Sequence, residues 1–125
     1  MGLPKKGKAP TVKSDSLLDL YEKLISTFPQ IERKGAANPY TSLNGNMFTL
    51  LQDSRRLAIR LPEAEREKFL QKYKTTLFEA YGAVMKEYAA VPDALLKNTK
   101  ELQKWLGLSY EYAKTLKPKP TKKRS

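Results

Sequence analysis

The sequence predicts an α+β fold in which a single antiparallel sheet of about five strands packs against helices, in the order α-β-β-β-α-β-β-α. Two observations carry this prediction. Apolar residues recur every three or four positions in residues 14–28 and 93–116, which is typical of helices with one buried face. Between these segments, short runs of strand-forming residues are separated by Asn44-Gly45 and Tyr81-Gly82, which is typical of hairpins.

The first predicted element is a helix over residues 14–28. Its side chains Ser14, Asp15 and Ser16 can each accept a hydrogen bond from the free amides of a first turn. Pro29 then ends the helix, because proline cannot continue the hydrogen-bond pattern. The buried face is expected to carry Leu17, Leu20, Tyr21, Leu24, Ile25 and Phe28.

Residues 40–61 predict a three-stranded meander. A phosphate-binding loop needs several glycines between a strand and a helix, whereas here Gly45 is a single glycine between two strands. The Asn44-Gly45 pair instead suits a type I′ turn, which requires positive φ at both central residues. The strand over residues 57–61 is expected to have one dry face and one wet face, the wet face carrying Ala58 and Arg60.

The second half of the chain predicts a helix, two strands and a last helix. Pro62 opens the helix over residues 62–73, and the three glutamates of its first turns are expected to form a solvated face near the positive end of the helix dipole. Strands are predicted over residues 76–80 and 85–91. Pro92 and Asp93 begin the last helix, in which Gly107 is expected to allow a bend or a break.

Length and composition predict one domain flanked by two basic tails. The 125 residues are 40% hydrophobic, which is enough for a packed core. Residues 1–13 and 117–125 are rich in lysine and proline and contain no acidic residue, so they are predicted to be disordered, with residues 14–116 as the folded unit. No apolar run approaches the roughly 18 residues of a membrane span, and the charged start lacks an apolar segment after it, so a cytoplasmic location is expected.

The net charge of +11 lies mainly in the tails, which hold +9 and leave 11 − 9 = +2 for residues 14–116. A tail of this kind suits weak, nonspecific contact with nucleic acid or simply keeps the protein in solution. Within the body, the cluster around residues 55–60 is the second candidate for nucleic-acid contact. The candidate residues are Lys5, Lys6, Lys8, Lys13, Lys117, Lys119, Lys122, Lys123, Arg124, Arg55, Arg56 and Arg60.

Catalytic and metal-binding chemistry is not indicated. The chain contains no cysteine and no histidine, which removes disulfides, thiolate metal sites and the commonest general base. No nucleophile has a recognisable partner at motif spacing. We therefore expect no catalytic residue, cofactor or metal site.

Four segments in order resemble the N-terminal domain of the TfoX/Sxy competence regulators, in particular its stand-alone single-domain members. The segments are NGNMFTLL, RRLAIRLP, LFEAYGAVMKEYAAVP and ELQKWLGLSYEYAKTLKP, and the resemblance covers residues 15–118. It implies an α+β sandwich with one antiparallel sheet, similar to the type III secretion chaperones. Full-length regulators of this kind promote transcription of DNA-uptake genes and have a second, helical C-terminal domain. The family offers no catalytic residues to carry over.

Three classes of function remain after these observations. The first is a non-catalytic regulatory or adaptor module that binds another protein or a second copy of itself. The second is a nucleic-acid-associated protein that uses its basic tails, and the third is an enzyme. The sequence favours the first, because the folded body is nearly neutral and lacks a catalytic constellation.

Overall fold

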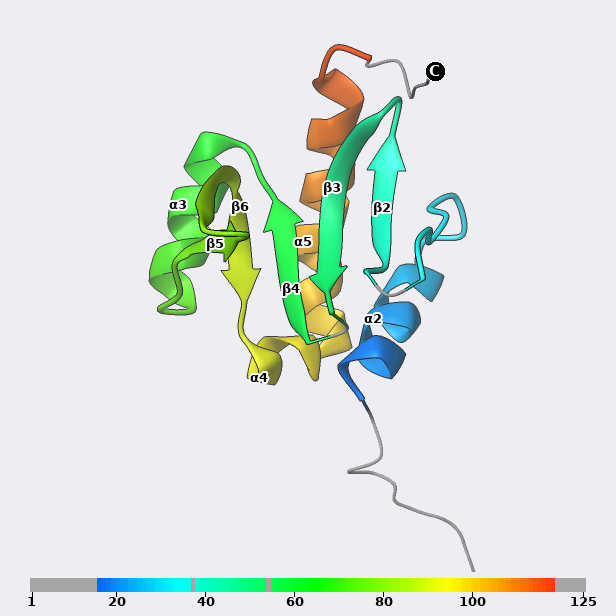
Figure 1. The fold of residues 1–125 in the computed structure, drawn as a ribbon, viewed down its shortest axis with the longest axis horizontal. Coiled ribbons are helices and arrows are strands. Elements are labelled where there is room, and N and C mark those ends of the chain that lie inside the picture. Colours follow the sequence, from blue (N-terminus) through cyan, green and yellow to red (C-terminus); the bar gives the residue numbers. More distant parts are fainter. Residues whose placement is uncertain (1–15, 37, 54, 119–125) are drawn as a thin grey trace, which may run out of the picture.

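The computed structural model describes residues 16–36, 38–53 and 55–118, and these form one five-stranded antiparallel sheet with helices packed on it (Figure 1). The strand order is β2-β3-β4-β6-β5, so the predicted α+β class and single sheet are confirmed. None of the helices in the described residues is long and apolar enough to cross a membrane. The elements are α2 (Leu17–Ser26), β2 (Tyr40–Leu43), β3 (Asn46–Gln52), β4 (Arg56–Arg60), α3 (Glu63–Lys72), β5 (Leu77–Ala80), β6 (Ala83–Val91), α4 (Asp93–Leu96) and α5 (Thr99–Thr115).

Both predicted hairpin turns are present. Asn44 and Gly45 have φ angles of 54° and 82° between β2 and β3, which confirms a hairpin turn with positive φ at both central residues. Tyr81 and Gly82 have φ angles of 55° and 78° between β5 and β6. Asparagine tolerates this left-handed region, whereas the same conformation at Tyr81 is unusual for a bulky residue.

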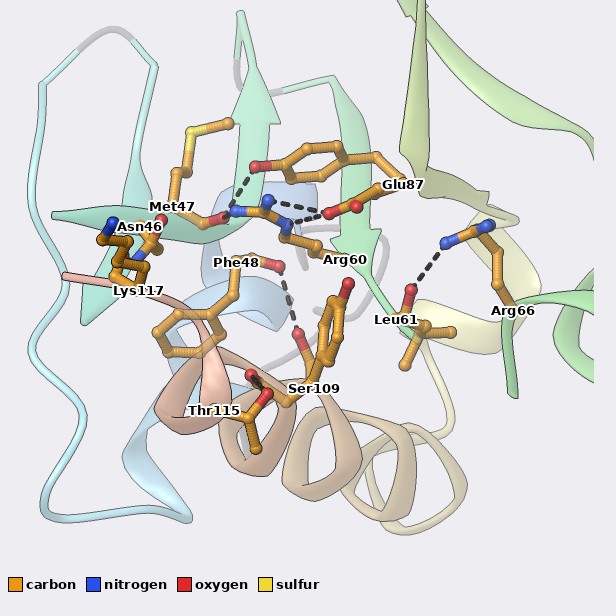
Figure 2. A network of polar contacts seen from close by, with 12 residues as sticks. Asn46, Met47, Phe48, Arg60, Leu61, Arg66, Glu87, Ser109, Thr115 and Lys117 are labelled. Carbon is orange, nitrogen blue, oxygen red and sulfur yellow. Dashed lines mark hydrogen bonds and ion pairs between the residues drawn. The ribbon is translucent and has the colours of Figure 1, made fainter. Parts of the chain in front are cut away.

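The main core lies between the sheet and the helices. Buried residues of α2, α4 and α5 pack there on those of β3, β4 and β6. Strand β3 has an irregularity that serves this packing: Thr41 pairs with Thr49 and Ser42 with Met47, so Phe48 has no partner in β2. The Phe48 carbonyl accepts a hydrogen bond from Ser109 Oγ of α5 at 3.2 Å (Figure 2).

The opposite face of the sheet is drier than the sequence predicts. Ala58, expected on a wet face, has no exposed surface and packs with Phe78 and Ala80 in a second, smaller core. Partly buried side chains of the β5–β6 hairpin and of β3 complete this core. The prediction of a wet face was wrong because the register between β5 and β6 shifts after Leu77, and residues of β5 then pack against the face of β4 that the alternating pattern assigned to solvent.

The C-terminal helical region is divided at a different point from the one expected. The chain turns between α4 and α5, where the Asn98 side chain accepts a hydrogen bond from the Glu101 amide at 3.3 Å and so caps α5. Helix α5 then runs without a break through Gly107. The Asn98 cap, and not Gly107, therefore marks where the helical region divides, because its side-chain oxygen satisfies a free amide at the start of α5.

Candidate functional site

Most of the predicted tail contacts fall outside the described residues, namely Lys5, Lys6, Lys8, Lys13, Lys119, Lys122, Lys123 and Arg124. Lys117 is described and is exposed to solvent. Its carbonyl accepts a hydrogen bond from Asn46 Nδ2 at 3.0 Å, which fixes the chain leaving α5 beside the β2–β3 turn (Figure 2). The side chain of Asn46 is buried, so this anchor is part of the fold.

Arg60 is bound within the protein. Its Nε and Nη2 atoms each lie 2.7 Å from Glu87 Oε1, and Nη1 donates to the Met47 carbonyl at 3.3 Å (Figure 2). The Tyr88 hydroxyl donates to the same carbonyl at 2.6 Å. Only 14% of the Arg60 side chain is exposed. This guanidinium therefore links β3, β4 and β6, and it offers little free surface to a phosphate.

Arg56 is also held by its neighbours. Its guanidinium donates to Gln52 Oε1 at 3.2 Å and to the Glu79 carbonyl at 2.8 Å, and it lies 4.7 Å from the centre of the Phe78 ring. Arg56 and Arg60 lie at opposite ends of β4, roughly 13 Å apart along an extended strand. The structure thus does not gather the three predicted arginines into one site.

Arg55, the third of these arginines, is exposed and borders a shallow groove of about 480 Å³. Two aspartates share this groove with the two arginines, so its formal charges cancel. A neutral lining does not favour a polyanion. The groove is lined by Leu17, Gln52, Asp53, Arg55, Arg56 and Asp93.

A second groove, of about 680 Å³, lies between the end of α2 and the first half of α5, and we name it the α2–α5 groove. Phe28 and Gly107 supply apolar surface, and Lys100 and Lys104 are exposed lysines one helical turn apart. Sequence reasoning missed this site, because Phe28 was assigned to the buried face of its helix and is in fact only partly buried. Its residues are Phe28, Asn98, Lys100, Glu101, Gln103, Lys104 and Gly107.

Glu101, the single acidic residue of this groove lining, is neutralised by residues of α3 and its C-terminal end. Its carboxylate accepts hydrogen bonds from the Tyr73 hydroxyl and from Lys72 Nζ, the latter at 3.0 Å. These two hydrogen bonds, with Tyr73 first, lower the pKa of Glu101 below its ordinary value of 4.5. The carboxylate is consequently charged and compensated at neutral pH.

The same contacts continue into an aromatic cluster. Trp105 Nε1 donates to the Tyr73 hydroxyl at 2.8 Å, and the Trp105 and Phe69 rings meet edge to face with centroids 5.1 Å apart. Burial and the bond to Glu101 raise the pKa of Tyr73, so its hydroxyl stays protonated and acts as a donor. Trp105 therefore joins α5 to α3 and to the residue that follows it, Tyr73.

The described part of the chain holds no cluster of acidic side chains that could bind a metal ion. Within residues 16–36, 38–53 and 55–118, no group of three or more His, Cys, Asp or Glu side chains is arranged to hold a metal ion.

The raised pKa values of Tyr88 and Tyr112 follow first from burial, which favours the neutral phenol. A neutral phenol can donate a hydrogen bond, as the Tyr88 hydroxyl does to the Met47 carbonyl.

The described residues form an α+β domain with one antiparallel sheet and an open groove along its last helix. The family model described as the TfoX N-terminal domain matches residues 31–113. The chain belongs to this family, as the resemblance predicted, and the family is regulatory and competence-related. No curated protein and no solved structure shows a significant match to the chain.

Proposed function

We propose that this protein is a non-catalytic regulatory or adaptor module that acts through protein–protein contacts of its folded body. The observation that carries the proposal is the α2–α5 groove, in which apolar surface from Phe28 lies beside two exposed lysines, Lys100 and Lys104, and a single carboxylate that Lys72 already pairs. Membership of a regulatory family supports the same function. A module of this kind works by holding a partner, and it needs no catalytic group.

A second candidate is a nucleic-acid-associated protein that uses its tails. The favouring observation is that residues 1–13 and 117–125 hold +9 of the net charge of +11. Lysines on such segments would contact phosphates without reading bases in a fixed geometry. This function predicts binding that depends on salt and on the tails, and the first function does not.

Affinity capture with the full chain separates the two functions. The immobilised protein is incubated with a lysate of its source cells, with and without nuclease. It is compared with a full-length variant in which the tail lysines and Arg124 are changed to glutamine. We expect a discrete protein partner that both baits retain after nuclease treatment. Recovery only of proteins that disappear with nuclease, or with tail neutralisation, would contradict the adaptor function and favour the second candidate.

A further inference from the structure

Gly107 is an unusual residue for the middle of a 17-residue helix. Glycine there destabilises a helix by about 1 kcal/mol relative to alanine. Nothing in the described chain requires it, because a Cβ atom added at Gly107 would meet Phe28 at 3.6 and 3.8 Å, which is ordinary contact. The missing side chain instead leaves space over the Phe28 ring, in the floor of the α2–α5 groove.

The rim of this groove carries a net positive charge, from two lysines against one glutamate. Lys100 forms no ion pair with the other described residues, and Lys104 approaches Glu101 only to 4.0 Å. Glu101 is already paired with Lys72 at 3.0 Å. Lys97, also exposed, precedes the Asn98 cap by one residue. The charge of the lining that remains available to a ligand is therefore positive.

From these observations we propose that the α2–α5 groove binds an acidic amphipathic helix of a partner protein. The apolar face of the helix would lie on Phe28 and Gly107, and its carboxylates would face Lys100 and Lys104. This is the helix-in-groove mode of recognition, with charge complementarity selecting the partner. A duplex phosphate backbone would pair with the lysines but would leave the apolar floor unused. The inference rests on the proposed function and adds the chemistry of the partner.

The probe for this site is a displayed library of helical peptides of about 18 residues, roughly 27 Å long. Apolar residues occupy the i, i+3, i+4 and i+7 positions, and the remaining positions are randomised over acidic, basic and neutral residues. Selection against the full chain should enrich peptides with net negative charge. Enrichment of basic or neutral peptides, or no enrichment, would overturn the proposal.

Variants of the full chain then locate the site. The double variant Lys100→Glu/Lys104→Glu should weaken the selected peptides by about tenfold or more, because two attractive contacts become repulsive. Gly107→Leu should also weaken them by filling the floor, whereas Gly107→Ala should have a smaller effect. The matched control is Lys86→Glu/Lys114→Glu, which changes the net charge equally at exposed positions outside the groove lining and should bind within about twofold of the wild type. Circular dichroism confirms that each variant is folded.

Four other outcomes each decide the matter. Equal binding by the groove variant and the control would overturn the proposal. The proposal would also be overturned if Lys100→Glu/Lys104→Glu no longer bound a random DNA duplex or an oligothymidine but still bound the peptides. The lysines would then serve nucleic acid. If a nuclease-resistant partner binds the wild type and the groove variant equally, this inference fails and the proposed function stands. If the peptides bind as expected but no such partner is captured, the site stands and the proposed function fails.

Discussion

At the scale of single residues, the buried Tyr21 shows how one polar group is accommodated in the core. Its hydroxyl lies 2.7 Å from Thr49 Oγ1, which in turn lies 2.6 Å from Thr41 Oγ1. Tyr21, Thr41 and Thr49 have almost no exposed surface, so these hydroxyls bond to one another and not to solvent. This chain of hydrogen bonds joins α2 to β2 and β3, and it satisfies groups that would otherwise be costly to bury.

Tyr21→Phe should lower the free energy of unfolding by about 1 kcal/mol at neutral pH, because one buried hydrogen bond is lost while the bond between the two threonines remains. The loss of unfolding free energy at alkaline pH should change as well. Burial raises the pKa of Tyr21 to about 12 from an ordinary 10.0. The folded protein therefore holds the phenol proton more tightly than the unfolded chain does. The resulting stability is fully present below pH 10 and is lost between pH 10 and 12. Urea titrations in these two ranges should show a smaller alkaline loss in Tyr21→Phe, and an identical loss in both proteins would contradict this assignment.

Trp105→Ala should lower the free energy of unfolding by about 3 kcal/mol, because the indole packs on Phe69 and Tyr73 and its removal leaves a cavity between α3 and α5. Trp105→Phe is the control, since it keeps most of the apolar contact and loses the bond to the Tyr73 hydroxyl. Trp105→Phe should therefore lower the free energy of unfolding by less than Trp105→Ala does. A loss below about 1 kcal/mol for Trp105→Ala in urea titration would show that the aromatic cluster does not hold α3 to α5.

At the scale of elements, two glycines should respond in opposite ways to the same change. Gly107→Ala should raise the free energy of unfolding by up to about 1 kcal/mol, because alanine favours the helix and its Cβ has room. Gly35→Ala should be destabilising, because Gly35 has a φ of 82° and a Cβ would lie 2.7 Å from the Asn38 carbonyl oxygen. Thermal unfolding followed by circular dichroism measures both. A destabilised Gly107→Ala would mean that the α2–α5 groove is packed more tightly than the structure shows.

Much of the order of elements could be predicted because its signals are local. An Asn-Gly pair selects a hairpin turn through its own φ angles, and a three- or four-residue apolar period identifies a helix without knowledge of the rest of the chain. The dry outer face at Ala58 could not be predicted in this way. It depends on a register shift between β5 and β6, and on Phe78, which lies 20 positions further along the sequence, packing against it.

The candidate site was only partly visible in the sequence for the same reason. The arginines around residues 55–60 are close in sequence, yet Glu87 and Glu79 hold two of them from other strands. Conversely, Lys100 and Lys104 show the spacing of one helix face, but the apolar floor comes from Phe28, which is distant in sequence. A groove between two helices is a product of tertiary packing, and charge spacing alone does not reveal it.

At the scale of the whole molecule, the charge is divided between a nearly neutral body and basic ends. The full chain should therefore bind random duplex DNA weakly, with log affinity falling by about 0.9 per phosphate contact against log salt. If about half of the nine tail charges engage, the slope should be about −4. Fluorescence anisotropy at two salt concentrations measures it. The tail-neutralised full chain should not bind, and sequence-specific binding by that variant would instead make the Arg55–Arg60 region the reader.

Whether the folded body holds a protein partner is decided by the affinity of the captured partner for two full-length baits. Calorimetry compares the wild type with the tail-neutralised variant at low and at moderate salt. If the body carries recognition, the two dissociation constants should agree within about twofold, and the salt slope should be shallower than about −2, because only a few lysines face the partner. A loss of binding on tail neutralisation, together with a slope near −4, would contradict the claim and assign recognition to the tails.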